Sequence, residues 1–193
     1  MLFEGTRERI VLHMATKTTI TWEEFLAAGE EWQRWELVDG EVEFMSPVNA
    51  RHEYVLSALI AYLFGFCQAH QEWACFASNV AFTMASGNWR MPDASLVRKE
   101  RFPGGRVSGA KIDFAPDVAF EIYSPGDTPS QLQYKRKDYQ ESVAIQVWID
   151  LDKRLVELIY PDRPLQYFEE DQALVIDKLP GFSLDLKTLF SLP

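Results

Sequence analysis

Cysteine and histidine are scarce in this sequence. Among its 193 residues are two cysteines, Cys67 and Cys75, and three histidines. A structural zinc site takes four ligands, mostly from these two residue types, so such a site has little support here. Both cysteines stand in apolar surroundings, which favours buried free thiols in a reducing compartment over a disulfide.

Long apolar runs are also missing. The longest apolar stretch, residues 54–67, is shorter than the roughly 20 residues that cross a bilayer. The N-terminal residues carry charged side chains where a signal peptide would have its apolar segment. These absences predict a cytoplasmic protein with no membrane association.

Basic side chains are outnumbered by acidic ones. The chain has 19 Lys and Arg against 29 Asp and Glu, for a net charge of -10. Proteins that coat nucleic acid need an excess of positive charge, so this balance excludes a broad nucleic-acid-coating surface and allows only a local basic patch. The length suits one domain with a sizeable core, and we expect a loose leader over residues 1–18 before a single domain over 19–193.

The apolar pattern switches between the periods of strands and helices, which predicts an α/β (α+β mixed) domain with a mixed sheet. Asp39-Gly40 between two alternating segments predicts a hairpin, and apolar residues at helical spacing predict a long helix over 50–69. The other expected elements are a short helix over 21–28, strands over 73–84, 89–97, 117–123, 145–150 and 154–160, a hairpin of 166–169 with 173–176, and a terminal helix over 184–190.

The stretch from Ala115 to Tyr139 places a carboxylate beside a helix that carries basic residues. Its first part alternates as a strand that contains Glu121, and the turn residues 124–127 end that strand. A capping box at 128–131, with proline at the first helical position, then begins a helix. This arrangement predicts that acids and a base gather at one end of a strand.

The helix after this turn presents two basic residues beside its buried face. Leu132, Tyr139 and Val143 lie nearly on one line, which predicts the buried stripe. Lys135 and Arg136 flank that stripe on its two sides, so periodicity does not choose between them. An exposed basic helix face, with only the side-chain stems covering apolar surface, is the alternative.

Two acids, Asp93 and Glu121, each stand in a short apolar strand. A carboxylate is costly there unless it is paired or coordinated. If the two converge, they can hold Mg²⁺ or Mn²⁺, which prefer oxygen ligands and water. Phosphodiester hydrolysis would follow, with the metal activating water and a lysine adding positive charge. Alternatively, both acids lie at strand ends and face solvent or pair with arginines.

Several motifs follow one another along the chain: WELVDGEVEFMSP, His52, Pro92-Asp93, PDVAFEIYSPGDT, Lys135 with Tyr139 four residues later, VWID and LPGF. In this order they resemble the Uma-type family of restriction-endonuclease-like proteins, members of the PD-(D/E)XK nuclease superfamily, over roughly residues 21–190. The resemblance implies a restriction-endonuclease-like core, in which helices flank a central mixed sheet, with an N-terminal hairpin and extra C-terminal strands. It also implies a Mg²⁺ site.

The resemblance assigns roles to particular residues. Asp93 matches the superfamily aspartate and Glu121 the second acid, so these two would bind the metal. The superfamily lysine stands two residues after that acid, where this chain has Tyr123. Lys135 occupies the position to which this family has moved its lysine, and Val143 stands where the family usually has glycine.

Two further positions match the family. Glu36 matches an N-terminal glutamate, which would bind metal or position water; the alternative is a charge that pairs with an arginine. His52 matches a histidine near the start of the long helix. It would act on a phosphate or water, or serve as a hydrogen-bonded structural residue.

A basic loop follows the strand of Asp93. The candidates for contact with a DNA backbone are Arg98, Lys99, Arg101, Arg106 and Lys111, together with Arg136 on the helix. A solvated loop without a ligand is the alternative. DNA is the expected partner of the nuclease, and a homodimer is expected because cutting two strands is simplest with two copies.

Three functions fit these observations. The preferred hypothesis is a Mg²⁺-dependent endonuclease that acts on DNA through Asp93, Glu121, Lys135 and Glu36. The second is a nuclease-like scaffold that binds nucleic acid or a protein partner without cutting, which the acidic balance and the displaced lysine favour. The third is a metal-independent carboxylate-pair hydrolase that acts on sugars.

Overall fold

The computed structural model describes residues 21, 24, 35–44, 49–109 and 111–191. The expected leader over 1–18 lies outside these residues. Of the helix expected over 21–28, Thr21 and Glu24 are described, and they make the reciprocal hydrogen bonds of a capping box. None of the helices in the described part of the chain combines the length and hydropathy that a membrane crossing requires.

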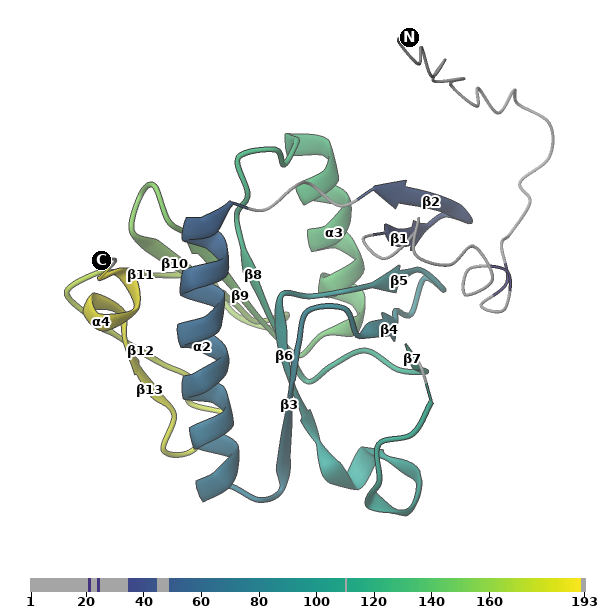
Figure 1. The fold of residues 1–193 in the computed structure, drawn as a ribbon, viewed down its shortest axis with the longest axis horizontal. Helices are drawn as coiled ribbons and strands as arrows, with labels where there is room; N and C mark the ends of the chain where they lie inside the picture. The colour runs from purple at the N-terminus through teal and green to yellow at the C-terminus, as the bar shows by residue number, and fades with distance from the viewer. Residues whose placement is uncertain (1–20, 22–23, 25–34, 45–48, 110, 192–193) are drawn as a thin grey trace, which may run out of the picture.

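A six-stranded mixed sheet forms the centre of the molecule (Figure 1). Its strands are β3 (Trp73–Ala77), β6 (Ala94–Arg98), β8 (Val118–Ile122), β9 (Ile145–Asp150), β10 (Leu155–Ile159) and β11 (Gln166–Glu169). Their order is β11-β10-β9-β8-β6-β3. β8 and β9 run parallel and the other neighbours antiparallel, which confirms the predicted mixed sheet.

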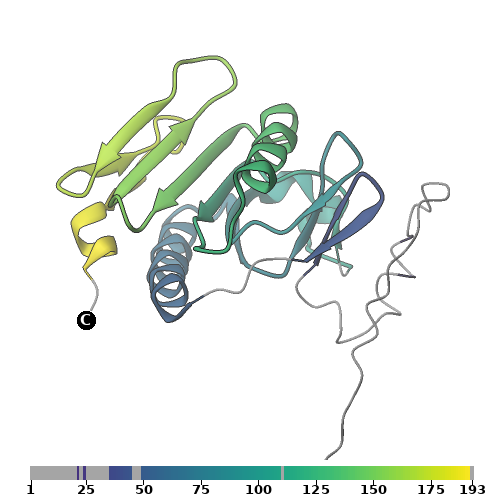
Figure 2. The same cartoon turned by 90° about the horizontal axis from the view of Figure 1, so that it is seen from above.

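Two helices cover opposite faces of this sheet, α2 (Ala50–Ala69) and α3 (Pro129–Ser142) (Figure 2). Successive residues of β8 show the division. Val118 and Phe120 belong to the apolar cluster that includes residues of α2, whereas Ala119 belongs to the cluster that includes Tyr139 of α3. Because both faces are covered, all five residues of β8 are buried.

The local signals at the starts of both helices are satisfied. Asn49 caps α2 by accepting a hydrogen bond from the backbone N–H of His52. Thr128 and Gln131 form the predicted capping box of α3, with Pro129 in its first turn. Tyr139 is fully buried, which confirms part of the predicted stripe of α3.

A second, five-stranded sheet packs beside the first. It contains β1 (Trp35–Val38), β2 (Glu41–Phe44), β4 (Ala81–Thr83), β5 (Trp89–Arg90) and β7 (Lys111–Ile112) in the order β2-β1-β5-β4-β7. β1 and β2 form the predicted hairpin.

The single strand expected over 89–97 is divided between the two sheets. Residues 89–90 pair in the smaller sheet as β5, and 94–98 pair in the larger sheet as β6. Pro92 lacks a backbone N–H and interrupts the ladder. As a result, Asp93 lies at the junction of the two sheets.

The hairpin expected between 166–169 and 173–176 is wrong. β11 pairs with β10, whereas β12 (Ala173–Val175) pairs with β13 (Ser183–Asp185), which precedes α4 (Leu186–Phe190). Leu174 and Leu184 face each other in this second pair and are buried in the core on the α2 side. The spacing of strands along the sequence does not show which strand each one pairs with, and the burial of Leu174 favours its pairing with Leu184. The two cysteines are free thiols, as predicted.

Candidate active site

The two acids singled out in the sequence lie at the same end of the central sheet. Ala94 faces Phe120 in the antiparallel pairing of β6 with β8, so the flanking Asp93 and Glu121 are neighbours. Their residues are 8% and 6% exposed, respectively. Asp93 Oδ2 also accepts a hydrogen bond of 2.8 Å from the backbone N–H of Ile122, which fixes that carboxylate at the sheet end.

Lys135 projects from α3 onto this acid pair. Its Nζ lies 2.9 Å from Glu121 Oε1 and 3.2 Å from Glu36 Oε1. Tyr139, one helical turn later, donates a hydrogen bond of 2.5 Å from its hydroxyl to Glu121 Oε1. The structure therefore places Lys135, and not Arg136, beside Glu121. The Lys135–Tyr139 spacing signalled a shared face, but sequence reasoning assigned Tyr139 to the core alone.

Arg136 and Tyr123 form a separate cluster. The guanidinium of Arg136 contacts the Tyr123 hydroxyl and the Glu157 carboxylate. It also stacks on Trp148, with Cζ 4.4 Å from the ring centroid. The tyrosine at the usual position of the superfamily lysine is thus bonded to this arginine and acid.

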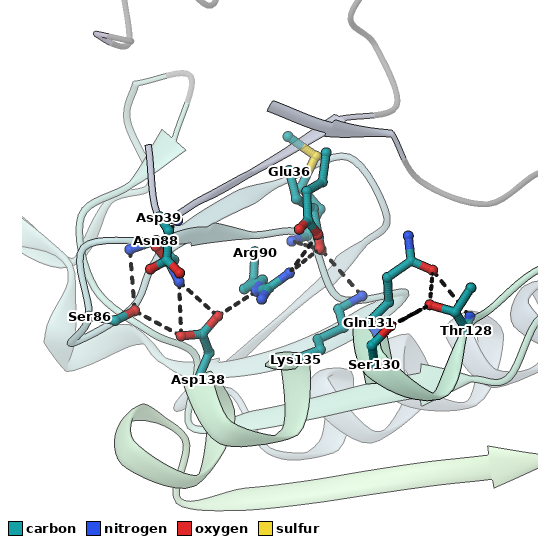
Figure 3. Close-up of polar contacts among 12 residues, drawn as sticks. Glu36, Asp39, Ser86, Asn88, Arg90, Thr128, Ser130, Gln131, Lys135 and Asp138 are labelled. Carbon is teal, nitrogen blue, oxygen red and sulfur yellow. Dashed lines mark hydrogen bonds and ion pairs between the residues drawn. The ribbon is translucent and has the colours of Figure 1, made fainter. Parts of the chain in front are cut away.

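Glu36 on β1 is held by several donors (Figure 3). Its Oε2 accepts a hydrogen bond of 2.8 Å from Arg90 Nη1, and its Oε1 accepts one of 2.9 Å from the backbone N–H of Met91. Arg90 also donates from Nε to Asp138 Oδ2 at 2.7 Å. Of the alternatives left open for Glu36, the structure shows the arginine pair, in addition to the contact with Lys135.

Arg90 and Asp138 were missed in the sequence. Arg90 is a charged residue in apolar surroundings, between Trp89 and Met91, whereas Asp138 stands among polar residues, between Lys137 and Tyr139. The argument that selected Asp93 applies to Arg90, because an isolated charge in an apolar strand is too costly to persist, but it gives no signal for Asp138. Their pairing, however, joins residues far apart in the sequence.

His52 lies at the first turn of α2 and contacts Asp93 of the acid pair. Its Nε2 is 3.3 Å from Asp93 Oδ2, and its residue is 1% exposed. Within the described part of the chain, Nδ1 makes no hydrogen bond, and it lies 3.6 Å from a carboxylate oxygen of Glu53. Burial lowers the pKa of His52, but the hydrogen bond to Asp93 and nearby negative charges outweigh it and raise the pKa above its ordinary value.

Burial and charge shift the pKa values of this cluster in opposite directions. Burial, together with the charges of Asp93 and Glu36, raises the pKa of Glu121 to about 8 against the opposing effect of Lys135. Burial lowers the pKa of Lys135, but Glu121 and Glu36 outweigh it and raise that pKa. Burial raises the pKa of Glu36, but Lys135 and Arg90 outweigh it and lower that pKa. The Glu121 carboxylate is therefore the acid whose ionisation a further cation would favour.

The donor set fits a hard divalent cation that keeps much of its water. Asp93 and Glu121 offer carboxylate oxygens, and Asp93 Oδ1 accepts no hydrogen bond within the described part of the chain. No group of three or more His, Cys, Asp or Glu residues with a metal-binding arrangement occurs among the described residues. Mg²⁺ is commonly bound through one or two carboxylates plus water and substrate phosphates, so two acids suffice for it.

The basic loop begins at the other end of β6. Asp93 precedes this strand and Arg98 ends it, and the turns η2 (Lys99–Arg101) and η3 (Pro103–Gly105) follow (Figure 1). Three of the basic residues contact other side chains: Arg98 stacks on Trp73, Arg101 pairs with Asp117, and Lys111 pairs with Asp113. Lys99 and Arg106 are exposed. The loop is not brought to the acid pair, and its contact with DNA stays a prediction.

A solved structure shares this fold. A crystal structure described as "a putative nuclease belonging to DUF820 from Anabaena variabilis ATCC 29413" aligns with a TM-score of 0.75 at 20% identity, covering 87% of this chain and 96% of that one. A DrdV–DNA complex solved by cryoEM aligns with a TM-score of 0.38 at 16% identity, covering 62% of this chain and 10% of that one. No curated protein sequence matches the chain.

The sequence also matches a family model. The model is that of Uma2, described as "Putative restriction endonuclease", and the match spans residues 22–187. This range contains Glu36, Asp93, Glu121 and Lys135, and it covers most of the chain. The fold of the DUF820 nuclease is consistent with this match. The chain therefore belongs to the Uma2 family.

Proposed function

We propose that this protein is a Mg²⁺- or Mn²⁺-dependent endonuclease that hydrolyses phosphodiester bonds in DNA. One observation carries the proposal: the largely covered ammonium of Lys135 lies 2.9 Å from Glu121 at the sheet end where Asp93 also lies. Two acids and a lysine at one point supply a cation site and a positive charge for a phosphate. The family description supports the same reaction class.

Asp93 and Glu121 would hold the metal, which when bound activates water and neutralises charge on the phosphate. His52 orients Asp93 from one side through its 3.3 Å contact, and the Ile122 N–H does so from another. Tyr139 orients Glu121 through its hydroxyl. These contacts fix both carboxylates before any ligand arrives, as preorganisation requires.

Lys135 supplies fixed positive charge. Its pKa is raised by Glu121 and Glu36, so the ammonium stays protonated at neutral pH. It therefore stabilises negative charge on a phosphate and is not a base. Its origin on α3 instead of β8 does not weaken this role, because only the position of Nζ relative to the phosphate matters.

A DNA duplex that lay along β6 would reach both the acid pair and the basic loop. A five-residue strand such as β6 is about 16 Å long, which corresponds to about five base pairs along one DNA strand. Lys99 and Arg106, exposed in this loop, would contact backbone phosphates, while the acidic remainder of the surface restricts binding to this face. A homodimer would present two such sites, one for each strand.

Cleavage of supercoiled plasmid tests the proposal. Wild type should nick or cut it with Mg²⁺ or Mn²⁺ and not with EDTA. Lys135→Met should lower kcat by roughly 10²–10³-fold, the usual loss when one charge-stabilising donor is removed. Lys137→Met is the matched control, because Lys137 is exposed on the same helix, and it should cleave like wild type. Equal activity in the two variants would contradict the assignment of Lys135.

One observation favours a second function, a nuclease-like scaffold that binds a partner without cutting. Lys135 lies within hydrogen-bonding distance of both oxygens of Glu121, so it occupies positions that a metal needs. A thermal-melt titration with Mn²⁺ separates the two functions. The endonuclease predicts a rise in Tm that is lost in Glu121→Gln, because a bound metal stabilises the folded state by mass action. The scaffold predicts no rise in either protein.

A further inference from the structure

Arg90 is a buried cation that joins two elements of the molecule. Its residue is 2% exposed, and its guanidinium lies between Glu36 on β1 and Asp138 on α3. Burying three charges is costly and is recovered only when their geometry satisfies them. This charged arrangement leads through Glu36 to Lys135. An apolar cluster would stabilise the fold equally well, so the charges indicate that Glu36 and Lys135 have to be held in fixed positions.

The far end of this network is anchored as well (Figure 3). Asp138 accepts hydrogen bonds from Asn88 Nδ2 at 3.0 Å and from Ser86 Oγ at 2.9 Å, in addition to Arg90. Asn88 Oδ1 in turn accepts a hydrogen bond of 2.8 Å from the backbone N–H of Asp39. The network therefore ties α3 to the turn before β5 and to the turn of the β1–β2 hairpin.

Both oxygens of the Glu36 carboxylate already have donors. Oε2 is taken by Arg90, and Oε1 is shared by the Met91 N–H and Lys135. Asp93 differs from it, because Asp93 Oδ1 accepts no hydrogen bond in the described part of the chain. Glu36 is thus the counter-ion of two cations, Arg90 and Lys135, whereas among the described residues Glu121 has an ion pair with Lys135 alone.

We propose that Glu36, Arg90 and Asp138 are positioning residues, and that Glu36 acts through Lys135 without binding the metal. This inference rests on the proposed endonuclease function. Lys135 has two carboxylate partners, Glu121 and Glu36. When Glu121 is engaged by a cation, Glu36 still holds the ammonium near the phosphate, and Arg90 with Asp138 keeps Glu36 in place.

The first test separates positioning from metal binding without using activity. Glu36→Gln leaves Arg90 paired with Asp138 and Lys135 paired with Glu121, so the folded structure should persist. A Mn²⁺ titration followed by thermal melts should give an affinity within about twofold of wild type for Glu36→Gln. Glu121→Gln should lose at least about tenfold, as expected for a ligand. A comparable loss in both variants would make Glu36 a ligand and overturn the inference.

The second test is a double-mutant cycle on plasmid cleavage. Glu36→Gln should lower kcat by about 10–100-fold and leave KM unchanged, because the variant displaces the ammonium of Lys135 but does not disturb the binding of the substrate. In a Lys135→Met background the same change should cost nothing further. Independent, multiplicative losses would show that Glu36 acts apart from the lysine and would also overturn the inference.

Asp138→Asn supplies a second variant that acts from the far end. It keeps Arg90 paired with Glu36, so it should retain Mn²⁺ affinity and lower kcat less than Glu36→Gln does, again only when Lys135 is present. A kcat loss that persists in the Lys135→Met background would assign Asp138 a structural role alone.

If wild type neither cleaves nor responds to Mn²⁺, the proposed function fails, and this inference fails with it. Wild-type cleavage combined with Mn²⁺ loss in Glu36→Gln overturns the inference alone.

Discussion

The two faces of the central sheet are built from different chemistry. The face under α2 is lined by aliphatic and aromatic side chains, among them Val118 and Phe120 of β8. The face under α3 also has an apolar cluster, but the buried acids Glu121 and Asp138 and the half-buried Lys135 lie beside it. A five-residue strand thus contributes to both faces, because its side chains alternate.

Because of this difference, the two faces are expected to contribute differently to the stability of the fold and to the function of the site. Apolar burial on the α2 face contributes roughly 25 cal/mol per Å² without directional demands. The charged network on the α3 face contributes little net stability, since the cost of desolvating each charge offsets the attraction between them. We infer that the α2 face maintains the fold, while the α3 face holds the proposed site, whose charges the fold alone does not require.

The largest expected effect is a loss of unfolding free energy when a buried side chain on the α2 face is truncated. Leu59→Ala removes a side chain that is 0% exposed in that core, and truncation of a buried leucine costs about 2–5 kcal/mol of unfolding free energy. Urea denaturation measures the loss. Leu165→Ala is the matched control, because Leu165 is 39% exposed and its truncation should cost about 0.5 kcal/mol or less.

Folded Leu59→Ala should bind Mn²⁺ as wild type does, because the acid pair keeps its hydrogen bonds. A large loss of Mn²⁺ affinity at a temperature where the variant is folded would show that the two faces are coupled. In that case the proposed separation of stability from function would be wrong.

Sequence reasoning succeeded where the signal was local. The Asp39-Gly40 turn, the capping box at Thr128 and the helical spacing over 50–69 are short-range patterns, and the structure has all three. Local cost also singled out Asp93 and Glu121, since each is an acid in an apolar strand, but it left open whether they converge, and the structure shows that they are neighbours.

The features that sequence reasoning missed are long-range. Arg90 pairs with Glu36 and Asp138 across the molecule, and no periodicity links residues of different elements. For the same reason, periodicity left Lys135 and Arg136 equivalent. Their acid partners, Glu121 and Glu157, decide between them only in three dimensions.

The next effect is a pH dependence that only the α3 face should show. The pKa of Glu121 is raised from 4.5 to about 8 in the folded state. Between these values the folded state binds more protons than the unfolded state, so stability falls as pH rises. The fall is at most about 1.4 kcal/mol per pH unit for one group.

Urea denaturation in EDTA at several pH values between 5 and 8 measures this slope. The difference between wild type and Glu121→Gln isolates it from His52, whose raised pKa also removes stability as pH rises through its folded value. Glu121→Gln should show the shallower decline. Adding Mn²⁺ to wild type should oppose the decline, because a cation favours the ionised carboxylate. Identical slopes in the two proteins would contradict the raised pKa of Glu121.

The smallest effect compares the caps of the two helices. Thr128→Ala removes the side-chain oxygen that accepts from Gln131 N–H in α3, and Asn49→Ala removes the one that accepts from His52 N–H in α2. Each should cost about 1 kcal/mol of unfolding free energy, the usual value of an N-cap. Stability alone should therefore not distinguish the two variants.

Function should distinguish them by the residue that each cap positions. Fraying the first turn of α3 loosens the segment before Lys135 and should lower kcat for plasmid cleavage. Fraying α2 loosens His52 and with it the Asp93 carboxylate, so Asn49→Ala should weaken Mn²⁺ binding instead. Melting curves with and without Mn²⁺, read beside cleavage rates, measure both effects. If both variants changed the same quantity, either Mn²⁺ affinity or kcat, Lys135 and Asp93 would have to move as one unit. The proposal that α2 positions the acid and α3 positions the lysine would then be wrong.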